Sequence, residues 1–164
     1  MNNDTNIEAR TFTLSRTFAA PRELVFAAFS QCEHLKHWWG PQGWSLPVCD
    51  MDFRVGGTWF YCMRGQDQDG KPMDSCGKST YEAIEAPEKI VYTDAFVDKE
   101  GNSLANTPTM HITVTFEAVD GKTQVTSVTV FATPEDLEAV KNMGMEQGVA
   151  ETWDKLEKHL ARVG

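Results

Sequence analysis

The sequence predicts an α+β domain with an antiparallel sheet of about seven strands, two short helices after the first strand and a long C-terminal helix. Three observations carry this prediction. Six segments rich in β-branched and aromatic residues follow one another between residues 48 and 132, joined by short turns. Two short helical segments separate them from one earlier strand, and an amphipathic stretch ends the chain. Runs of strands with the helices set apart are typical of α+β folds.

The N-terminal part of the chain predicts one strand and two short helices. Residues 11–18 alternate between polar and mostly apolar side chains, which is the pattern of a half-buried strand. Pro21 suits the first turn of a helix whose apolar face falls between residues 24 and 29. Ser30 and Glu33 have the spacing of a capping box, which predicts that a second short helix begins there.

The later strands are expected to form an antiparallel meander, because short connections join them. Asp120-Gly121 lies between two alternating segments, and this pair is a strong hairpin signal. The strands are expected at residues 48–53, 58–64, 78–84, 89–96, 110–118 and 123–132.

The strands stop where signals for a helix start appear. Thr133 can cap a helix and Pro134 fits its first position. Asn142 and Gly144 are expected to break or kink the beginning of this helix. Beyond them, apolar residues recur on one helical face up to the end of the helix near residue 163; they are Val149, Trp153, Leu156 and Leu160.

Length and charge bound the class of protein. A chain of 164 residues fits one domain, expected at residues 9–164 after a flexible tail at residues 1–8. The net charge of −9 disfavours binding to nucleic acid, which relies on Lys and Arg. No segment approaches the roughly 20 apolar residues of a membrane span, and the polar N-terminus lacks a signal-peptide pattern. We therefore expect no membrane insertion and a cytoplasmic location.

The four cysteines are scattered and form no CxxC pair or ligand-like cluster; they are Cys32, Cys49, Cys62 and Cys76. In a cytosolic protein such residues are expected to be reduced, partly buried thiols.

Several local motifs resemble those of a known family. In chain order they are Ala20-Pro21-Arg22-Glu23-Leu24-Val25-Phe26, Glu33-His34-Leu35, Trp38-Trp39-Gly40-Pro41, Gly56-Gly57-Thr58-Trp59, Met63-Arg64-Gly65, Pro87-Glu88-Lys89-Ile90-Val91-Tyr92-Thr93 and Thr113-Val114-Thr115-Phe116-Glu117. With them, the chain resembles the SRPBCC (START-like) superfamily over residues 9–162. Within it, the similar group is the one named for the C-terminal domain of the activator of heat-shock-protein-90 ATPase.

The resemblance implies a helix-grip fold, in which the curved antiparallel sheet of about seven strands wraps around the long C-terminal helix. It also implies an apolar cavity between the sheet and that helix. Members of the group often carry a Gly-Trp pair in that helix. Here Gly148 is followed by Val149, and the tryptophan lies one turn later at Trp153. A smaller side chain at a position expected to face the cavity means that the pocket shape of relatives does not transfer to this chain.

The candidate ligand-binding residues are those expected on the inner face of the sheet, on the last helix and in the tryptophan-rich loop. Trp59, Tyr61 and Met63 alternate and therefore share one face of a strand. Filling of a solid core is the alternative explanation for the residues on the strands and the last helix. The loop tryptophans Trp38, Trp39 and Trp44 could instead form a mobile lid or a partner-facing patch, or one of them could plug the end of the sheet while another lies half exposed. The candidate set comprises Trp39, Trp59, Tyr61, Met63, Tyr81, Met110, Ile112, Met145, Val149 and Trp153.

Other chemistry is less well supported. His34 and His37 are interpreted as surface histidines, and His111 as facing outward, so no metal site and no cofactor are predicted. The sequence carries no nucleophile motif, phosphate loop or metal signature. The groups available for acid–base chemistry on strands are Tyr61, Tyr81, Glu82, Tyr92 and Asp94.

Three functions remain open. The leading hypothesis is binding of a small hydrophobic molecule in the cavity. The second is an enzyme, cyclase-like or hydrolase-like, that acts on such a molecule, and it requires polar groups in the cavity. The third, implied by the family name alone, is a chaperone-associated interaction protein. A homodimer formed through a sheet edge or the tryptophan-rich loop is a further hypothesis.

Overall fold

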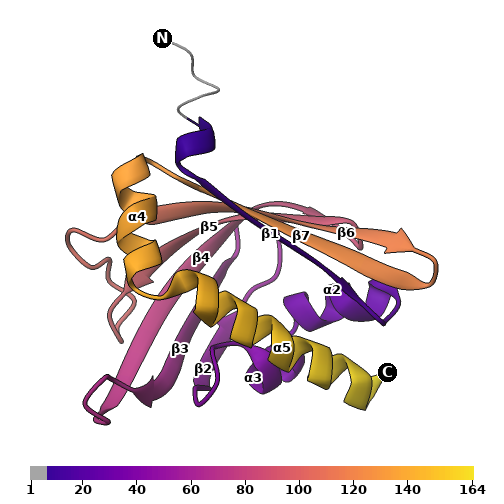
Figure 1. The fold of residues 1–164 in the computed structure, drawn as a ribbon, viewed down its shortest axis with the longest axis horizontal. Helices are drawn as coiled ribbons and strands as arrows, with labels where there is room; N and C mark the ends of the chain where they lie inside the picture. The colour runs from indigo at the N-terminus through magenta and orange to yellow at the C-terminus, as the bar shows by residue number, and fades with distance from the viewer. Residues whose placement is uncertain (1–6) are drawn as a thin grey trace.

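The chain folds into an antiparallel sheet that curves around the C-terminal helix (Figure 1). A computed structural model describes residues 7–164, so the predicted tail lies mostly outside the described residues, and residues 7–9 form a helical turn. The elements are β1 (Thr11–Phe18), α2 (Arg22–Ser30), α3 (Cys32–Trp38), β2 (Ser45–Met51), β3 (Thr58–Gln66), β4 (Pro72–Glu85), β5 (Lys89–Val97), β6 (Thr109–Val119), β7 (Lys122–Phe131), α4 (Pro134–Asn142) and α5 (Met145–Val163). The predicted α+β helix-grip fold is confirmed.

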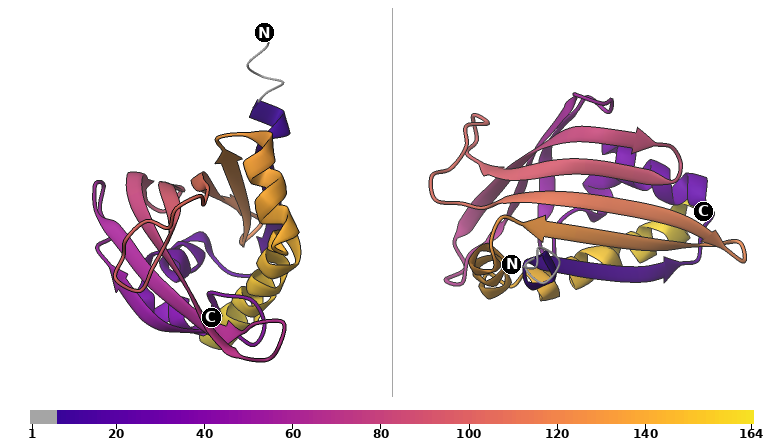
Figure 2. Two further views of the ribbon diagram at one scale, coloured as in Figure 1. Left: turned by 90° about the vertical axis from the view of Figure 1, so that its left-hand side faces the viewer. Right: turned by 90° about the horizontal axis from the view of Figure 1, so that it is seen from above.

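The seven strands form one sheet in the order β1-β7-β6-β5-β4-β3-β2, with every neighbouring pair antiparallel. β2 to β7 follow one another as the predicted meander, and β1 joins the far edge by pairing with β7. The predicted hairpin joins β6 and β7, where Asp120 and Gly121 both adopt positive φ. That conformation matches the right-handed twist of the two strands, which contributes to the curvature seen in Figure 2.

The C-terminal helical region is two helices rather than one. The Thr133 side chain accepts a hydrogen bond from the backbone N–H of Asp136 at 3.1 Å, which caps α4 as predicted. α4 ends at Asn142, and Gly144 adopts φ +88° before α5 begins. Glycine reaches this left-handed conformation at little cost, so the chain turns here and α5 crosses the concave side of the sheet (Figures 1 and 2).

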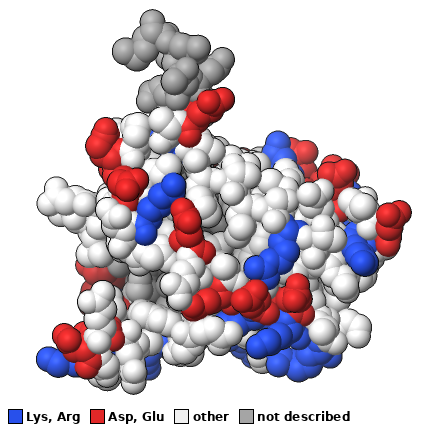
Figure 3. Space-filling model, viewed as in Figure 1, with Lys and Arg blue, Asp and Glu red and all other residues white. Residues whose placement is uncertain are grey.

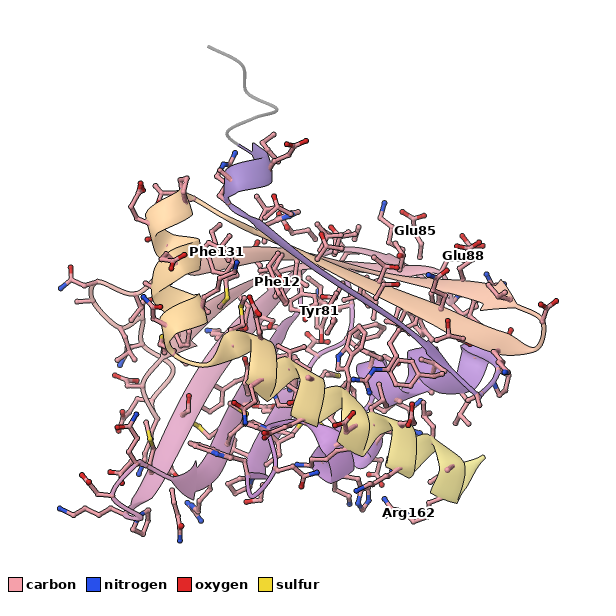
Figure 4. The ribbon with its side chains drawn as sticks, viewed as in Figure 1. Phe12, Tyr81, Glu85, Glu88, Phe131 and Arg162 are labelled. Carbon is pink, nitrogen blue, oxygen red and sulfur yellow. A yellow bond between two sulfur atoms is a disulfide. The ribbon has the colours of Figure 1, made fainter. Side chains whose placement is uncertain are left out.

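The two halves of α5 have different surroundings. In its C-terminal half, Leu156 and Leu160 are buried in the principal core, near α2 and α3. In its N-terminal half, Val149 is only partly buried. Figure 4 shows Phe12 and Tyr81 on the side of the sheet that faces α5, while Glu85 and Glu88 lie on the opposite side. The helix is therefore anchored at one end and leaves room beneath the other.

Some element boundaries differ from the predictions. β4 begins at Pro72, although the sequence predicts its start at residue 78. Residues 73–77 lack β-branched side chains, so their sequence does not indicate a strand. Pairing with β3 holds them in the extended conformation. The capping-box prediction is wrong, because the Ser30 hydroxyl donates back to the Phe26 carbonyl oxygen at 2.9 Å and α3 has no side-chain cap.

The prediction of reduced thiols is wrong. Cys32 in α3 is bonded to Cys49 in β2, and Cys62 in β3 is bonded to Cys76 in β4. Spacing along the sequence could not reveal these pairs, because tertiary contact of α3 with β2 and the β3–β4 register create them. Because the cysteines are paired, reduced thiols no longer support a cytoplasmic location. The cytoplasmic location stays a prediction.

The disulfide between α3 and β2 is expected to contribute measurably to stability. Replacing both Cys32 and Cys49 by serine should lower the free energy of unfolding by about 3 kcal/mol, because the bond closes a 17-residue loop. Urea unfolding measures the difference, which should disappear when both proteins are unfolded in the presence of a reductant, because neither then has a disulfide. Equal stability of the parent and the double variant without reductant would contradict the pairing.

The surface carries mixed charge. Figure 3 shows acidic and basic side chains interspersed over the face that carries α4 and α5. In residues 7–164, no helix is long and apolar enough to cross a membrane.

Candidate functional site

A cavity of about 350 Å³ lies between the sheet and the N-terminal half of α5. Inward-facing side chains of β1, β3, β5, β6 and β7 form one wall, and side chains from Met145 to Trp153 of α5 form the opposite wall. The Trp39-Gly40-Pro41 segment closes one side. Alternation along each strand places apolar residues on this face, so the lining is mostly aromatic, aliphatic and methionine side chains.

Most of the candidate ligand-binding residues come together at this cavity. The eight that line it are Trp39, Tyr61, Met63, Met110, Ile112, Met145, Val149 and Trp153. Trp59 and Tyr81 do not line it. Trp59 packs behind Trp39 and Tyr61, with ring centroids 4.8 and 4.4 Å away, and Tyr81 packs against Phe53 at 5.0 Å. These two side chains support the wall from outside the cavity.

The three tryptophans of the loop region have three different roles. Trp38 is fully buried and its indole Nε1–H donates to the Ala28 carbonyl oxygen at 3.1 Å. Trp39 lines the cavity, and Trp44 is half-buried over Gly65, where an added Cβ would collide with its ring. Trp38 thereby anchors the segment that carries Trp39.

Two side chains of α5 fasten the loop at residues 40–44 to the helix. The Lys155 ammonium donates to the carbonyl oxygens of Gly40 and Trp44, both at 3.1 Å. One Glu151 carboxylate oxygen accepts from the Gln42 backbone N–H at 3.1 Å. Burial lowers the pKa of Lys155. These hydrogen bonds hold the loop at residues 40–44 against α5. The loop closes one side of the cavity, and α5 forms the wall opposite the sheet.

A buried carboxylate interrupts the apolar lining. Asp94 of β5 lines the cavity and is 8% exposed. The Tyr61 hydroxyl donates to its Oδ2 at 2.9 Å, and the Ser79 hydroxyl donates to its Oδ1 at 3.1 Å. Tyr61 lies on β3, Ser79 on β4 and Asp94 on β5, and the antiparallel register of these strands brings the three side chains together. The sequence singled out Tyr61 and Asp94 as candidate acid–base groups but missed Ser79.

The surroundings perturb both titratable groups of this cluster. Burial raises the pKa of Asp94 to about 6, although hydrogen bonds from Tyr61 and Ser79 favour the ionised carboxylate. Burial and the adjacent Asp94 carboxylate raise the pKa of Tyr61 well above its ordinary value. Tyr61 therefore stays a neutral hydroxyl, while Asp94 can change protonation near neutral pH.

Gly77 makes this cluster possible. It is the β4 partner of Tyr61, and a Cβ at this position would overlap the Tyr61 ring and hydroxyl. Without a side chain there, the ring lies across β4 and reaches Asp94 on β5. No pattern in a single sequence distinguishes this glycine from one that serves a turn.

We expect Gly77→Ala to displace the Tyr61 ring and to destabilise the protein by about 1–3 kcal/mol, the usual cost of overpacking. Gly148→Ala is the matched control, because a Cβ there meets nothing within 4 Å, and it should be neutral or slightly stabilising. Urea unfolding compares the two variants. Equal stability of both would contradict the close approach at Gly77.

A cluster of histidines lies outside the cavity, between α3 and α5. His34 Nδ1 is 2.8 Å from His159 Nε2, the His37 ring stacks on the His159 ring, and the Arg162 guanidinium is 3.0 Å from His159 Nδ1. His37 is exposed as predicted, but His34 is half-buried and bonded to a histidine that the sequence analysis missed. Among residues 7–164, no three His, Cys, Asp or Glu side chains are placed to hold a metal ion. His111 faces outward and pairs with Glu82 at 2.9 Å.

Acid is expected to weaken the fold through His159. Burial and the nearby positive groups lower its pKa to about 4. As the pH falls below 6.5, His159 becomes protonated in the unfolded chain, but in the folded chain it stays neutral down to about pH 4. The folded state therefore loses stability between these two pH values. Between pH 7 and 5 the loss should be on the order of 1–2 kcal/mol.

Replacing His159 by glutamine removes this titration. Protonation of Asp94 stabilises the folded state as the pH falls over the same range, so it opposes the effect of His159. The test therefore measures the change in unfolding free energy between pH 7 and 5 in the parent and subtracts the same change in His159→Gln. Urea unfolding at the two pH values gives both changes, and a difference near zero would contradict the buried neutral imidazole.

A curved antiparallel sheet that grips a C-terminal helix across an apolar cavity defines a START-like, helix-grip protein. The family comparison specifies the group. The chain belongs to the family described as Activator of Hsp90 ATPase homolog 1-like protein, whose model matches residues 19–161. The predicted membership of the related SRPBCC group is confirmed.

Similar solved structures come from several bacteria. A Mycobacterium smegmatis protein is 28% identical with a TM-score of 0.85, and the match covers 94% of this chain and 93% of that one. An Arthrobacter aurescens protein is 29% identical with a TM-score of 0.85, covering 94% and 88%. A Staphylococcus epidermidis protein is 36% identical with a TM-score of 0.80, covering 93% and 90%. A comparison with curated proteins finds no match.

Proposed function

We propose that the protein binds a small hydrophobic molecule in the cavity between the sheet and α5. The observation that carries the proposal is a mostly apolar pocket of about 350 Å³, partly open to solvent, between the sheet and the N-terminal half of α5. Protein interiors are normally filled to the density of organic crystals, so a space this large is a feature that requires an explanation. Its volume falls at the small end of the range of ligand pockets.

The composition of the walls supports the same proposal. Met63, Met110 and Met145 line the cavity from three different elements, and methionine adapts to ligands of varied shape. The aromatic side chains Trp39 and Trp153 add large apolar surfaces. Such a cavity favours an apolar guest with few polar groups.

Binding can be tested by the stabilisation that a guest confers. A ligand that binds only the folded state raises the free energy of unfolding by about 2.7 kcal/mol when its free concentration is 100 times its Kd. We expect 1-octanol, a flexible apolar probe, to raise the melting temperature in a dose-dependent manner and to give a 1:1 complex in native mass spectrometry. No stabilisation at saturating concentrations would contradict the proposal.

A second candidate function is an enzyme acting on such a guest, favoured by one observation. Asp94, with its pKa near 6, and the Tyr61 hydroxyl both line the cavity. A carboxyl group that changes protonation near the working pH suits general acid–base catalysis. In that case Asp94→Asn would abolish turnover of a bound compound while leaving its binding measurable. Turnover that survives in this variant would remove Asp94 from the reaction.

A further inference from the structure

The hydrogen bonds of Asp94 leave a concentration of acceptors in the cavity. The single hydroxyl proton of Tyr61 is donated to Oδ2, and that of Ser79 is donated to Oδ1. The backbone N–H of Ala95 is also directed to this carboxylate. Because these protons are already used in hydrogen bonds to Asp94, a guest meets only the remaining lone pairs of the carboxylate and of the Tyr61 oxygen. They can accept hydrogen bonds but cannot donate them.

Within the described residues, no Lys, Arg or His side chain forms an ion pair with this acceptor group, and the ion pairs there involve other carboxylates. A buried carboxylate without a cation is costly. The three donors preorganise the ionised form but do not neutralise it, so a cation arriving from outside would gain the missing ion pair in surroundings of low polarity.

The other walls also suit a cation. Aromatic side chains from several elements line the same cavity: Trp39, Tyr61, Tyr92, Phe96 and Trp153. The faces of such rings attract cations, and this attraction is larger where water is excluded. The net charge of −9 adds a long-range attraction for a positive ligand.

We infer that the guest is an apolar molecule with a protonated amine at one end, and that the Asp94 carboxylate receives this amine while the hydrocarbon body occupies the rest of the cavity. The inference rests on the proposed function and specifies its ligand class. Asp94 is thereby a specificity residue. A guest that presents a carboxylate to the same group would bring two negative charges together and should be rejected.

The test compares three probes with the same hydrocarbon chain: octylamine, 1-octanol and octanoate. At pH 7.5 Asp94 is mostly ionised, since its pKa lies near 6. By calorimetric titration we expect octylamine to bind about tenfold or more tightly than 1-octanol, and octanoate to bind most weakly. In Asp94→Asn the preference for the amine should disappear while 1-octanol still binds. Ser127→Ala, which changes a lining hydroxyl outside the Asp94 cluster, should retain the preference.

The outcomes separate this inference from the proposed function. Binding of 1-octanol at least as tight as that of octylamine would overturn the amine assignment and leave the apolar cavity intact. The same holds if the amine preference survives in Asp94→Asn, because another group would then recognise the amine. Absence of binding by all three probes would overturn the proposed function and the assignment with it. Should Asp94→Asn fail to fold, the order of the three probes in the parent protein decides.

Discussion

Trp38→Ala is expected to lower the free energy of unfolding by about 3–5 kcal/mol, the range for deleting a large buried aromatic side chain. The ring is fully buried, lies 4.8 Å from the Phe29 ring and 5.5 Å from the Trp39 ring, and donates to the Ala28 carbonyl oxygen. Its removal leaves a void and an unpaired carbonyl where α2, α3 and the cavity wall meet. Chemical unfolding measures the loss.

The control for this variant is Lys36→Ala, because Lys36 is exposed on the same helix. Substitution there should change stability by less than about 0.5 kcal/mol. Since Trp39 follows Trp38 directly and lines the cavity, Trp38→Ala should also weaken ligand binding. A Trp38→Ala protein as stable as the Lys36→Ala protein would refute the anchoring role of Trp38.

Val149→Trp is expected to weaken ligand binding strongly while the protein stays folded. Val149 lines the cavity from α5 and is only partly buried, so a larger ring would extend into the open space. We expect affinity for 1-octanol to fall by at least about tenfold, or 1.4 kcal/mol, with little change in unfolding free energy.

Glu157→Trp provides the matched control on the exposed face of the same helix, and it should leave binding unchanged. The measurement is calorimetric titration of both variants with 1-octanol, alongside circular dichroism as a check of folding. Unimpaired binding by a folded Val149→Trp protein would mean that the guest sits elsewhere.

Much of the fold could be predicted because local sequence and tertiary structure agree. The alternation in residues 11–18, the Asp120-Gly121 turn and the Thr133 cap each favour a conformation that packing also requires. The long helix was placed correctly, and Gly144 marks its break. The periodicity of apolar residues, together with the cavity that the family resemblance implied, identified ten candidate residues, of which eight line one cavity.

The features that sequence reasoning missed depend on contacts across the sheet or between helices. The disulfides require knowledge of the strand register and of the packing of α3 on β2. The partner of His34 is His159, 125 residues later. Ser79 joins Asp94 only because β4 and β5 pair in one register. Trp59 faces inward as expected, yet Trp39 packs between it and the cavity, which alternation along a strand cannot show.

The most direct test of the account is the location of a bound guest. Intermolecular nuclear Overhauser effects between 1-octanol and the protein report which methyl groups touch the alkyl chain. We predict contacts to Met110, Ile112 and Val149, which line the cavity from β6 and α5. Contacts only to exposed apolar residues such as Val55 and Leu104 would contradict an internal binding site.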